Sequence, residues 1–132
     1  MLNDRSEVSP TVRQLQQARA LLEDPRRWCK GAARKGDRFC VSRAVIECVP
    51  DWRRYRHVRD ANNYLWPPGT PRHSMPEANW FLRAALYLID PTSDGRIYRW
   101  NDASERTHGE VLALIDMAVE IALEDADYQA AA

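Results

Sequence analysis

The chain of 132 residues has the length of one ordinary domain, and its 19 basic and 19 acidic side chains leave it with no formal net charge. No apolar stretch reaches the roughly 20 residues that a membrane span requires, and the first ten residues lack the apolar run of a secretory signal. The three cysteines, at spacings of eleven and eight, fit neither a disulfide framework nor a metal knuckle. We expect a soluble cytoplasmic protein with reduced thiols that binds no cofactor, metal or membrane.

The neutral total conceals a strongly basic middle segment. Between Arg26 and Arg59 there are eleven Lys and Arg residues and three acids, whereas five Arg and twelve acids follow from Asp60 to the end. A chain with this division either pairs its halves internally or presents a basic face to a partner. Internal pairing or solvation of the charges is the more common outcome.

The first predicted element is a helix that ends before Asp24-Pro25. Ser9-Pro10 is typical of a helix start, and the apolar residues that follow recur at three- and four-residue steps. The basic residues 26–38 are predicted to form an irregular connection with a turn at Gly36-Asp37. Residues 39–49 suit a short helix that is buried on one side, with a strand at 38–41 as the alternative.

The middle of the chain is predicted to hold two further helices. Residues 52–65 form a basic helix with an aromatic seam, and the proline-rich residues 66–73 form a loop, because proline removes amide donors and keeps its neighbours extended. A second helix starts at 74–77 and runs to Ile89. Because it is apolar around most of its circumference, it is predicted to be the buried central helix.

The last third begins with residues 96–100, whose alternation predicts a short strand. Thr107 and Glu110 have the spacing of a capping box, so a helix should start there. Its predicted apolar stripe consists of Val111, Leu112, Ile115, Ala118, Val119 and Ala122. Together, the predicted elements indicate a mostly α, single compact domain over residues 1–132, with about five helices and possibly one short strand or hairpin. Residues 1–9 and 126–132 are predicted to be frayed tails.

Three groups of residues carry a resemblance to a known family. They are Ala18 to Leu22 with Pro25 and Trp28-Cys29-Lys30-Gly31; Trp100-Asn101-Asp102; and Arg106-Thr107-His108 with Glu110-Val111-Leu112. In these residues the chain resembles a family of small uncharacterised bacterial and phage-encoded proteins, a domain of unknown function. The resemblance covers both ends of the chain but not the middle, from about Cys40 to Pro76. It implies a stand-alone small helical protein and brings no activity and no functional residues with it.

The sequence contains residues of the types that two kinds of active site require. Cys29 could act as a nucleophile with His108 as its base and Asn101 or Asp102 orienting the imidazole, but no oxyanion-hole glycine pattern accompanies the thiol. The His-x-Glu pattern at 108–110 resembles that of zinc deaminases, yet no cysteine follows Cys48 to complete the metal site. The other possible metal site would consist of Asp102, His108 and a third ligand that is distant in the sequence. Packing and helix capping explain the same residues without chemistry.

A nucleic-acid interface is the second possibility. Arg53, Arg54, Arg56 and Arg59 lie beside aromatic residues that could stack on bases, and the basic residues of 26–38 could extend that surface. Solvated or internally paired charge is the simpler explanation.

The polar segment before the last helix is the remaining candidate site. It could hold an anionic ligand at the helix N-terminus, or its side chains could lock the loop through hydrogen bonds, which we favour. Its residues are Trp100, Asn101, Asp102, Arg106 and His108. We therefore expect a non-enzymatic binding module with a protein partner or self-association. The alternative is nucleic-acid binding through residues 26–59, and the third possibility is a small hydrolase or metal-dependent enzyme centred on His108.

Overall fold

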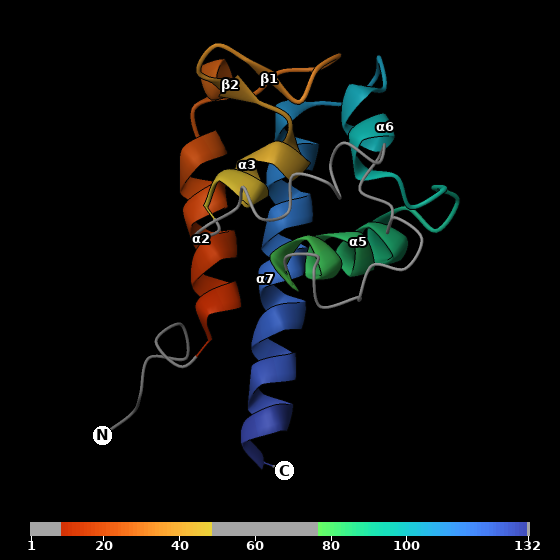
Figure 1. The fold of residues 1–132 in the computed structure, drawn as a ribbon. Coiled ribbons are helices and arrows are strands. Elements are labelled where there is room, and N and C mark those ends of the chain that lie inside the picture. Colours follow the sequence, from red (N-terminus) through yellow and green to blue (C-terminus); the bar gives the residue numbers. More distant parts are fainter. Residues whose placement is uncertain (1–8, 49–76, 132) are drawn as a thin grey trace, which may run out of the picture.

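The computed structural model describes residues 9–48 and 77–131 of the chain. In these two ranges the fold is mostly α, as predicted, with five α-helices and one two-stranded antiparallel sheet (Figure 1). The elements in chain order are α2 (Pro10–Leu22), the short 3-10 helix η1 (Pro25–Arg27), β1 (Arg34–Lys35), β2 (Arg38–Phe39), α3 (Val41–Glu47), α5 (Glu77–Ile89), α6 (Ile97–Asp102) and α7 (His108–Ala131). The predicted basic helix at 52–65 and the loop at 66–73 lie outside the described residues.

Helix α7 is the central element of the described core. It runs the length of the molecule beside α2 and makes its most extensive contacts with α5 and α2 (Figure 1). Its fully buried side chains are Val111, Leu114, Ile115, Ala118 and Ala122. The predicted stripe is therefore correct in register, although Leu112 and Val119 are only partly buried. The helix continues to Ala131 and so includes residues 126–131 of the predicted frayed tail.

Helix α2 forms where the sequence predicts it. The Ser9 hydroxyl accepts a hydrogen bond from the amide of Val12 at 3.3 Å, and Pro10 occupies the first helical position. The apolar residues that recur at helical spacing after Pro10 are fully buried; they are Val12, Leu15, Ala18 and Leu22. On the outside, Arg19 bonds Asp116 of α7 at 3.1 Å.

The connection between α2 and α3 contains a tight hairpin. The register pairs Arg34 with Phe39 and Lys35 with Arg38, and Gly36 has the positive φ of 63° that the two-residue turn requires. Both alternatives for residues 38–49 hold in part, because β2 at 38–39 is followed, after Cys40, by α3. Burial of α3 is not confined to one side as predicted, since all of its residues except Glu47 are buried.

Two predictions about single elements are wrong. Residues 96–100 were predicted as a strand, but Arg96 is the N-cap of α6 and residues 97–100 belong to that helix, in which Ile97, Trp100 and Asn101 are buried at helical spacing. A five-residue alternation fits either period, and contact with α3 and α5 selects the helix. Helix α5 is not buried around its circumference: its inner face packs on α7, α3, α2 and α6, and Trp80, Tyr87 and Leu88 on its outer face are exposed. No helix among the described residues is long and apolar enough to span a membrane.

Candidate functional site

The candidate site forms around the carboxamide of Asn101, which is fully buried. Its oxygen accepts hydrogen bonds from the Trp28 indole at 2.7 Å and from the Val41 amide at 3.1 Å. Its nitrogen donates to the carbonyl of Cys29 at 3.0 Å. We call these four residues the Asn101 cluster. It joins the end of α6 to the segment before the hairpin and to the start of α3.

The Asn101 cluster completes an interrupted parallel ladder. Trp28 and Phe39 form a parallel β-bridge, and the Cys29 amide donates to the Phe39 carbonyl at 3.0 Å. The next rung of such a ladder would join the Val41 amide to the Cys29 carbonyl. The Asn101 carboxamide is inserted between those two groups and bonds to each. An asparagine is suited to this position because its side chain presents both an acceptor and a donor, as a peptide group does.

Asp102 and Lys30 hold the same region together from its edge. The Asp102 carboxylate accepts from the Gly31 amide at 3.0 Å. The Lys30 ammonium donates to the carbonyls of Ala103 at 2.8 Å and Ser104 at 3.2 Å, and lies 5.4 Å from the centre of the Trp28 ring. The lysine thus adds a charged donor at the C-terminal end of α6, where the Ala103 carbonyl also accepts from the Arg106 amide at 3.0 Å.

Arg106 fixes the loop that leads into α7. Its guanidinium carbon lies 3.9 Å from the centre of the Trp100 ring, and its Nε donates to the Trp100 carbonyl at 2.9 Å. A second guanidinium nitrogen lies 3.2 Å from the carboxylate of Glu110. This stacked and bonded arginine is directed at groups of its own chain.

The predicted capping box is confirmed at the start of α7. The Glu110 carboxylate accepts from the Thr107 amide at 2.8 Å, and the Glu110 amide donates to the Thr107 hydroxyl at 3.2 Å. The Thr107 amide holds the pKa of Glu110 below its usual range, and the nearby Arg106 charge acts in the same direction. The carboxylate is therefore stabilised in its charged form by the helix start.

His108 links the start of α7 to the end of α2. Its Nε2 lies 2.6 Å from the carbonyl oxygen of Leu22, and its ring centroid is 6.0 Å from that of Trp28. A carbonyl oxygen only accepts, so Nε2 carries the proton in this hydrogen bond. The imidazole thus satisfies a carbonyl that the C-terminus of α2 leaves without a helical partner.

The residues proposed for cysteine chemistry have separate partners. The buried Cys29 thiol contacts the Ala32 carbonyl at 3.5 Å, and burial raises its pKa, although Lys35 acts in the opposite direction. A nucleophilic cysteine needs a lowered pKa, so this environment disfavours the thiolate. Among the described residues, no group of three or more His, Cys, Asp or Glu side chains is placed to hold a metal ion.

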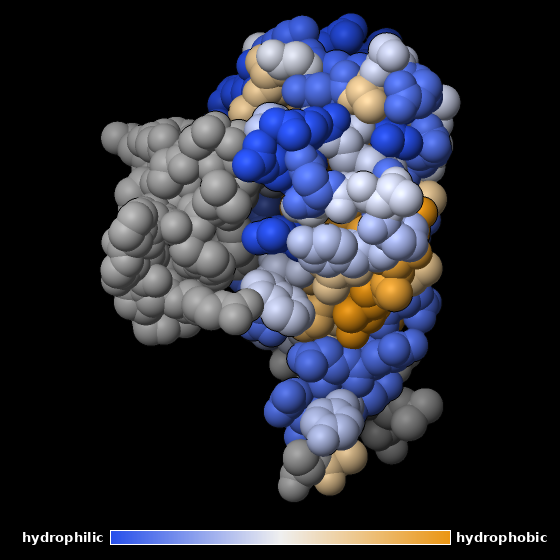
Figure 2. Space-filling model, turned by 90° about the vertical axis from the view of Figure 1, so that its right-hand side faces the viewer, coloured by the Kyte–Doolittle hydropathy of each residue, from blue (hydrophilic) through white to orange (hydrophobic). Residues whose placement is uncertain are grey.

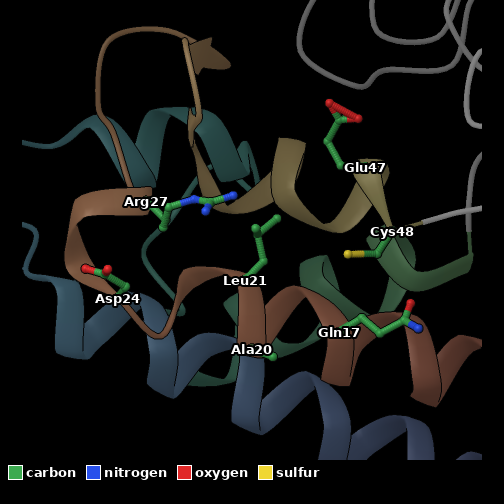
Figure 3. Close-up of a pocket in the computed structure, with 7 residues that line it drawn as sticks. All are labelled: Gln17, Ala20, Leu21, Asp24, Arg27, Glu47 and Cys48. Atoms are coloured by element: carbon green, nitrogen blue, oxygen red, sulfur yellow. The ribbon is translucent and has the colours of Figure 1, made fainter.

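A shallow groove lies between α2 and α3, on another side of the fold. Figure 3 shows Leu21 and the sulfur of Cys48 directed into it from the two helices, with Arg27 toward one end and Glu47 toward the other. Burial, with a contribution from Glu47, raises the pKa of Cys48 to about 11. None of the residues that line this groove belongs to the polar segment before α7, although Arg27, Glu47 and Cys48 lie within residues 26–59 of the nucleic-acid alternative.

The structure thus brings together all five residues of the predicted polar segment, and adds Trp28 and Lys30 to them. The signal for these two was present in the Trp-Cys-Lys-Gly run that carries the family resemblance. The arginines predicted for a nucleic-acid interface lie outside the described residues; they are Arg53, Arg54, Arg56 and Arg59.

Fold and site together define a small helical domain in which hydrogen bonds among distant polar residues hold the loops around one long helix. The chain belongs to the family of unknown function DUF6197, whose model matches residues 7–121. This confirms the expected membership of an uncharacterised family, and the match also runs through the middle segment that the resemblance omitted. Neither the curated proteins nor the solved structures include one that matches the chain.

Proposed function

We propose that the protein is an interaction module that associates with a second copy of itself through the outer face of α5. The observation that carries the proposal is the concentration of exposed apolar side chains on this helix. Of the five large hydrophobic residues that are exposed in the described ranges, four belong to α5 and one, Tyr128, to α7. The four are Trp80, Tyr87, Leu88 and Ile89.

Three of these side chains, Trp80, Tyr87 and Leu88, form a second apolar face on α5, whereas Ile89 lies on the side of the inner face at the end of the helix. The inner face packs into the core through Ala78, Phe81, Leu82, Ala85 and Leu86. At 3.6 residues per turn, the outer residues Trp80, Ala84, Tyr87 and Leu88 lie within an arc of about 100°. We call these four residues the α5 outer stripe. Figure 2 shows apolar atoms gathered in the middle of one side of the molecule, with hydrophilic surface above and below them.

Exposure of this extent is unfavourable unless the surface is covered. Leu88 is 63% exposed, Tyr87 47% and Trp80 46%. Burying a leucine side chain contributes about 1.5–3 kcal/mol, so covering this stripe would give a contact a substantial driving force.

The order of the side chains favours a second copy as the occupant. Large residues, Trp80 and Leu88, lie four positions on either side of the small Ala84. Two antiparallel α5 helices related by a two-fold axis near Ala84 would place Trp80 of one copy opposite Leu88 of the other. The two alanines would let the helices approach closely at the centre. Such self-complementary contacts are the commonest basis of homodimers, and zero net charge keeps long-range repulsion between copies small.

Sedimentation velocity over a range of protein concentrations tests the proposal. We expect the native chain to show a reversible dimer and Leu88→Glu to weaken dimerisation by at least about tenfold, because a carboxylate would be buried in the contact. Ala113→Glu, at an exposed position of α7, is the matched control and should dimerise like the native chain. A native chain that stays monomeric at the highest concentration, or a Leu88→Glu variant that dimerises normally, would contradict self-association.

Disulfide cross-linking tests the antiparallel register separately. An Ala84→Cys variant should form a cross-linked dimer under mild oxidation, because the two-fold axis brings this position close to itself. Gln16→Cys on the exposed side of α2 should not. Equal cross-linking of both variants would exclude the register.

We infer a bacterial or phage origin from the family resemblance alone. We also infer a cytoplasmic location, since Cys29, Cys40 and Cys48 are free thiols, as expected in a reducing compartment. A different protein partner in place of the second copy is the alternative occupant, and it would leave the isolated chain monomeric in the sedimentation experiment. An enzyme centred on His108 ranks last, because that imidazole is bonded to Leu22.

A further inference from the structure

We propose that the β1–β2 hairpin binds the phosphate backbone of a nucleic acid through Lys35 and Arg38. The inference is independent of the proposed self-association, because the hairpin and α5 are different parts of the fold. In Figure 1 the hairpin lies at the top of the molecule, at the opposite end from the C-terminus of α7.

The hairpin contains an arrangement that is unfavourable for the fold by itself. Lys35 and Arg38 are directly opposite each other in the register of the two strands, and both are exposed. Like charges at opposed positions of an antiparallel pair destabilise it. The sheet has two residues in each strand, so it offers few other contacts to offset the repulsion. A local conflict of this kind is expected where a surface has a function.

The cationic side chains near the hairpin bond to acidic or carbonyl groups of the protein, whereas those of Lys35 and Arg38 form no ion pair with any described residue. Arg26 bonds Asp24 at 2.8 Å, Arg34 lies 3.4 Å from Glu47, and Lys30 caps α6. Within the described ranges, neither Lys35 nor Arg38 forms an ion pair. Their charges remain available for an external anion.

The surroundings increase the attraction for a polyanion. Residues 24–40 contain six Lys and Arg and only two acids, Asp24 and Asp37. Two adjacent cations at the tip of a β-ribbon match the repeating charge of a nucleic-acid strand, and a two-stranded ribbon fits the width of a DNA major groove. An acidic peptide carries charge without this regular spacing, so we favour the nucleic acid.

Fluorescence anisotropy with a short labelled DNA duplex, measured at about 50 mM and about 200 mM NaCl, tests the proposal. The native chain should bind at the lower salt concentration and lose affinity steeply at the higher one. The double variant Lys35→Gln/Arg38→Gln should bind about tenfold more weakly, and the slope of log affinity against log salt should fall by about two. Arg13→Gln/Arg99→Gln removes the same charge from α2 and α6 and should retain native affinity within about twofold.

Three outcomes would overturn the proposal. They are an absence of binding at the lower salt concentration, an equal loss in both double variants, and equally tight binding of an acidic peptide of the same charge. Thermal unfolding provides the folding check. Removing the opposed charges should leave the midpoint unchanged or raise it, and a lowered midpoint would instead assign the pair a structural role.

Discussion

The Trp28 indole donates a 2.7 Å hydrogen bond to the Asn101 carboxamide across 73 residues of sequence. This bond joins the segment before the hairpin to the end of α6, and the same carboxamide reaches α3 through Val41. The residues that resemble the family motif therefore meet in one place. Their polar groups bond to one another, so the polar segment supports the fold, and the surfaces proposed for binding lie elsewhere.

Replacing His108 by Ala should lower the free energy of unfolding by about 1–3 kcal/mol, because the Leu22 carbonyl loses its partner. Urea unfolding followed by far-UV circular dichroism measures the change. Ser104→Ala, an exposed position in the same loop, should stay within about 0.5 kcal/mol of the native chain. Equal stability of His108→Ala and the native chain would show that the imidazole does not support the fold.

A side chain at Gly95 should destabilise the fold. Its φ of +81° is in the left-handed region, and an added Cβ would overlap the Tyr87 hydroxyl. We expect Gly95→Ala to lower the free energy of unfolding by more than about 1 kcal/mol. Gly109, inside α7 with open space around it, is the matched control: Gly109→Ala should be neutral or stabilising by up to about 1 kcal/mol. The same effect at both glycines would contradict the role assigned to Gly95.

The charge of Glu110 should stabilise the fold in a pH-dependent way. The folded pKa is below the ordinary 4.5, so the contribution is complete above that value and is lost as the pH falls through the folded pKa. Glu110→Gln keeps an acceptor for Thr107 but not the charge. The native chain should be more stable than this variant at neutral pH, and the two should converge in acid. Urea midpoints measured against pH test this, and a difference that persists in acid would refute it.

Asp24 should add a second step at lower pH. Its hydrogen bonds to Arg26 lower its pKa from 3.8 to about 2. Its contribution is therefore present above pH 3.8 and lost toward pH 2. In the same titration, Asp24→Asn should approach the native chain only in this lower range. Convergence already above pH 4.5, where Glu110 is still charged, would contradict the assignment.

The thiols should react slowly near neutral pH. Burial raises the pKa of all three cysteines, to about 11 for Cys40 and Cys48. Alkylation by iodoacetamide, followed by mass spectrometry, should modify the partly exposed Cys48 first and the buried Cys29 and Cys40 only on unfolding. Rapid modification of Cys29 in the folded chain would contradict this and support the hypothesis that Cys29 is a nucleophile.

Elements with strong local signals could be predicted from the sequence. The Ser9 cap, the stripe of α2 and the Thr107–Glu110 box depend on residues three or four positions apart, and the structure confirms them. The polar segment before α7 could also be singled out. Its contacts could not, because the ladder that Asn101 completes exists only after Trp28 and Phe39 have paired.

Contacts between residues distant in sequence determine the conformation of α6 and the burial of α5, the two features that were predicted wrongly. The residues of α6 alternate too briefly to distinguish a strand from a helix, and contact with its neighbours decides. The apolar residues around most of α5 predicted complete burial, whereas only its inner face packs on the other helices and the α5 outer stripe is exposed. The same pattern is typical of a helix that is covered by another molecule.

The free energy of unfolding of Asn101→Ala, measured by urea denaturation, tests most directly that the polar segment supports the fold. The variant leaves the Trp28 indole, the Val41 amide and the Cys29 carbonyl without their partner. We predict a loss of about 2–4 kcal/mol or failure to fold. An Asn101→Ala chain as stable as the native one would contradict the account.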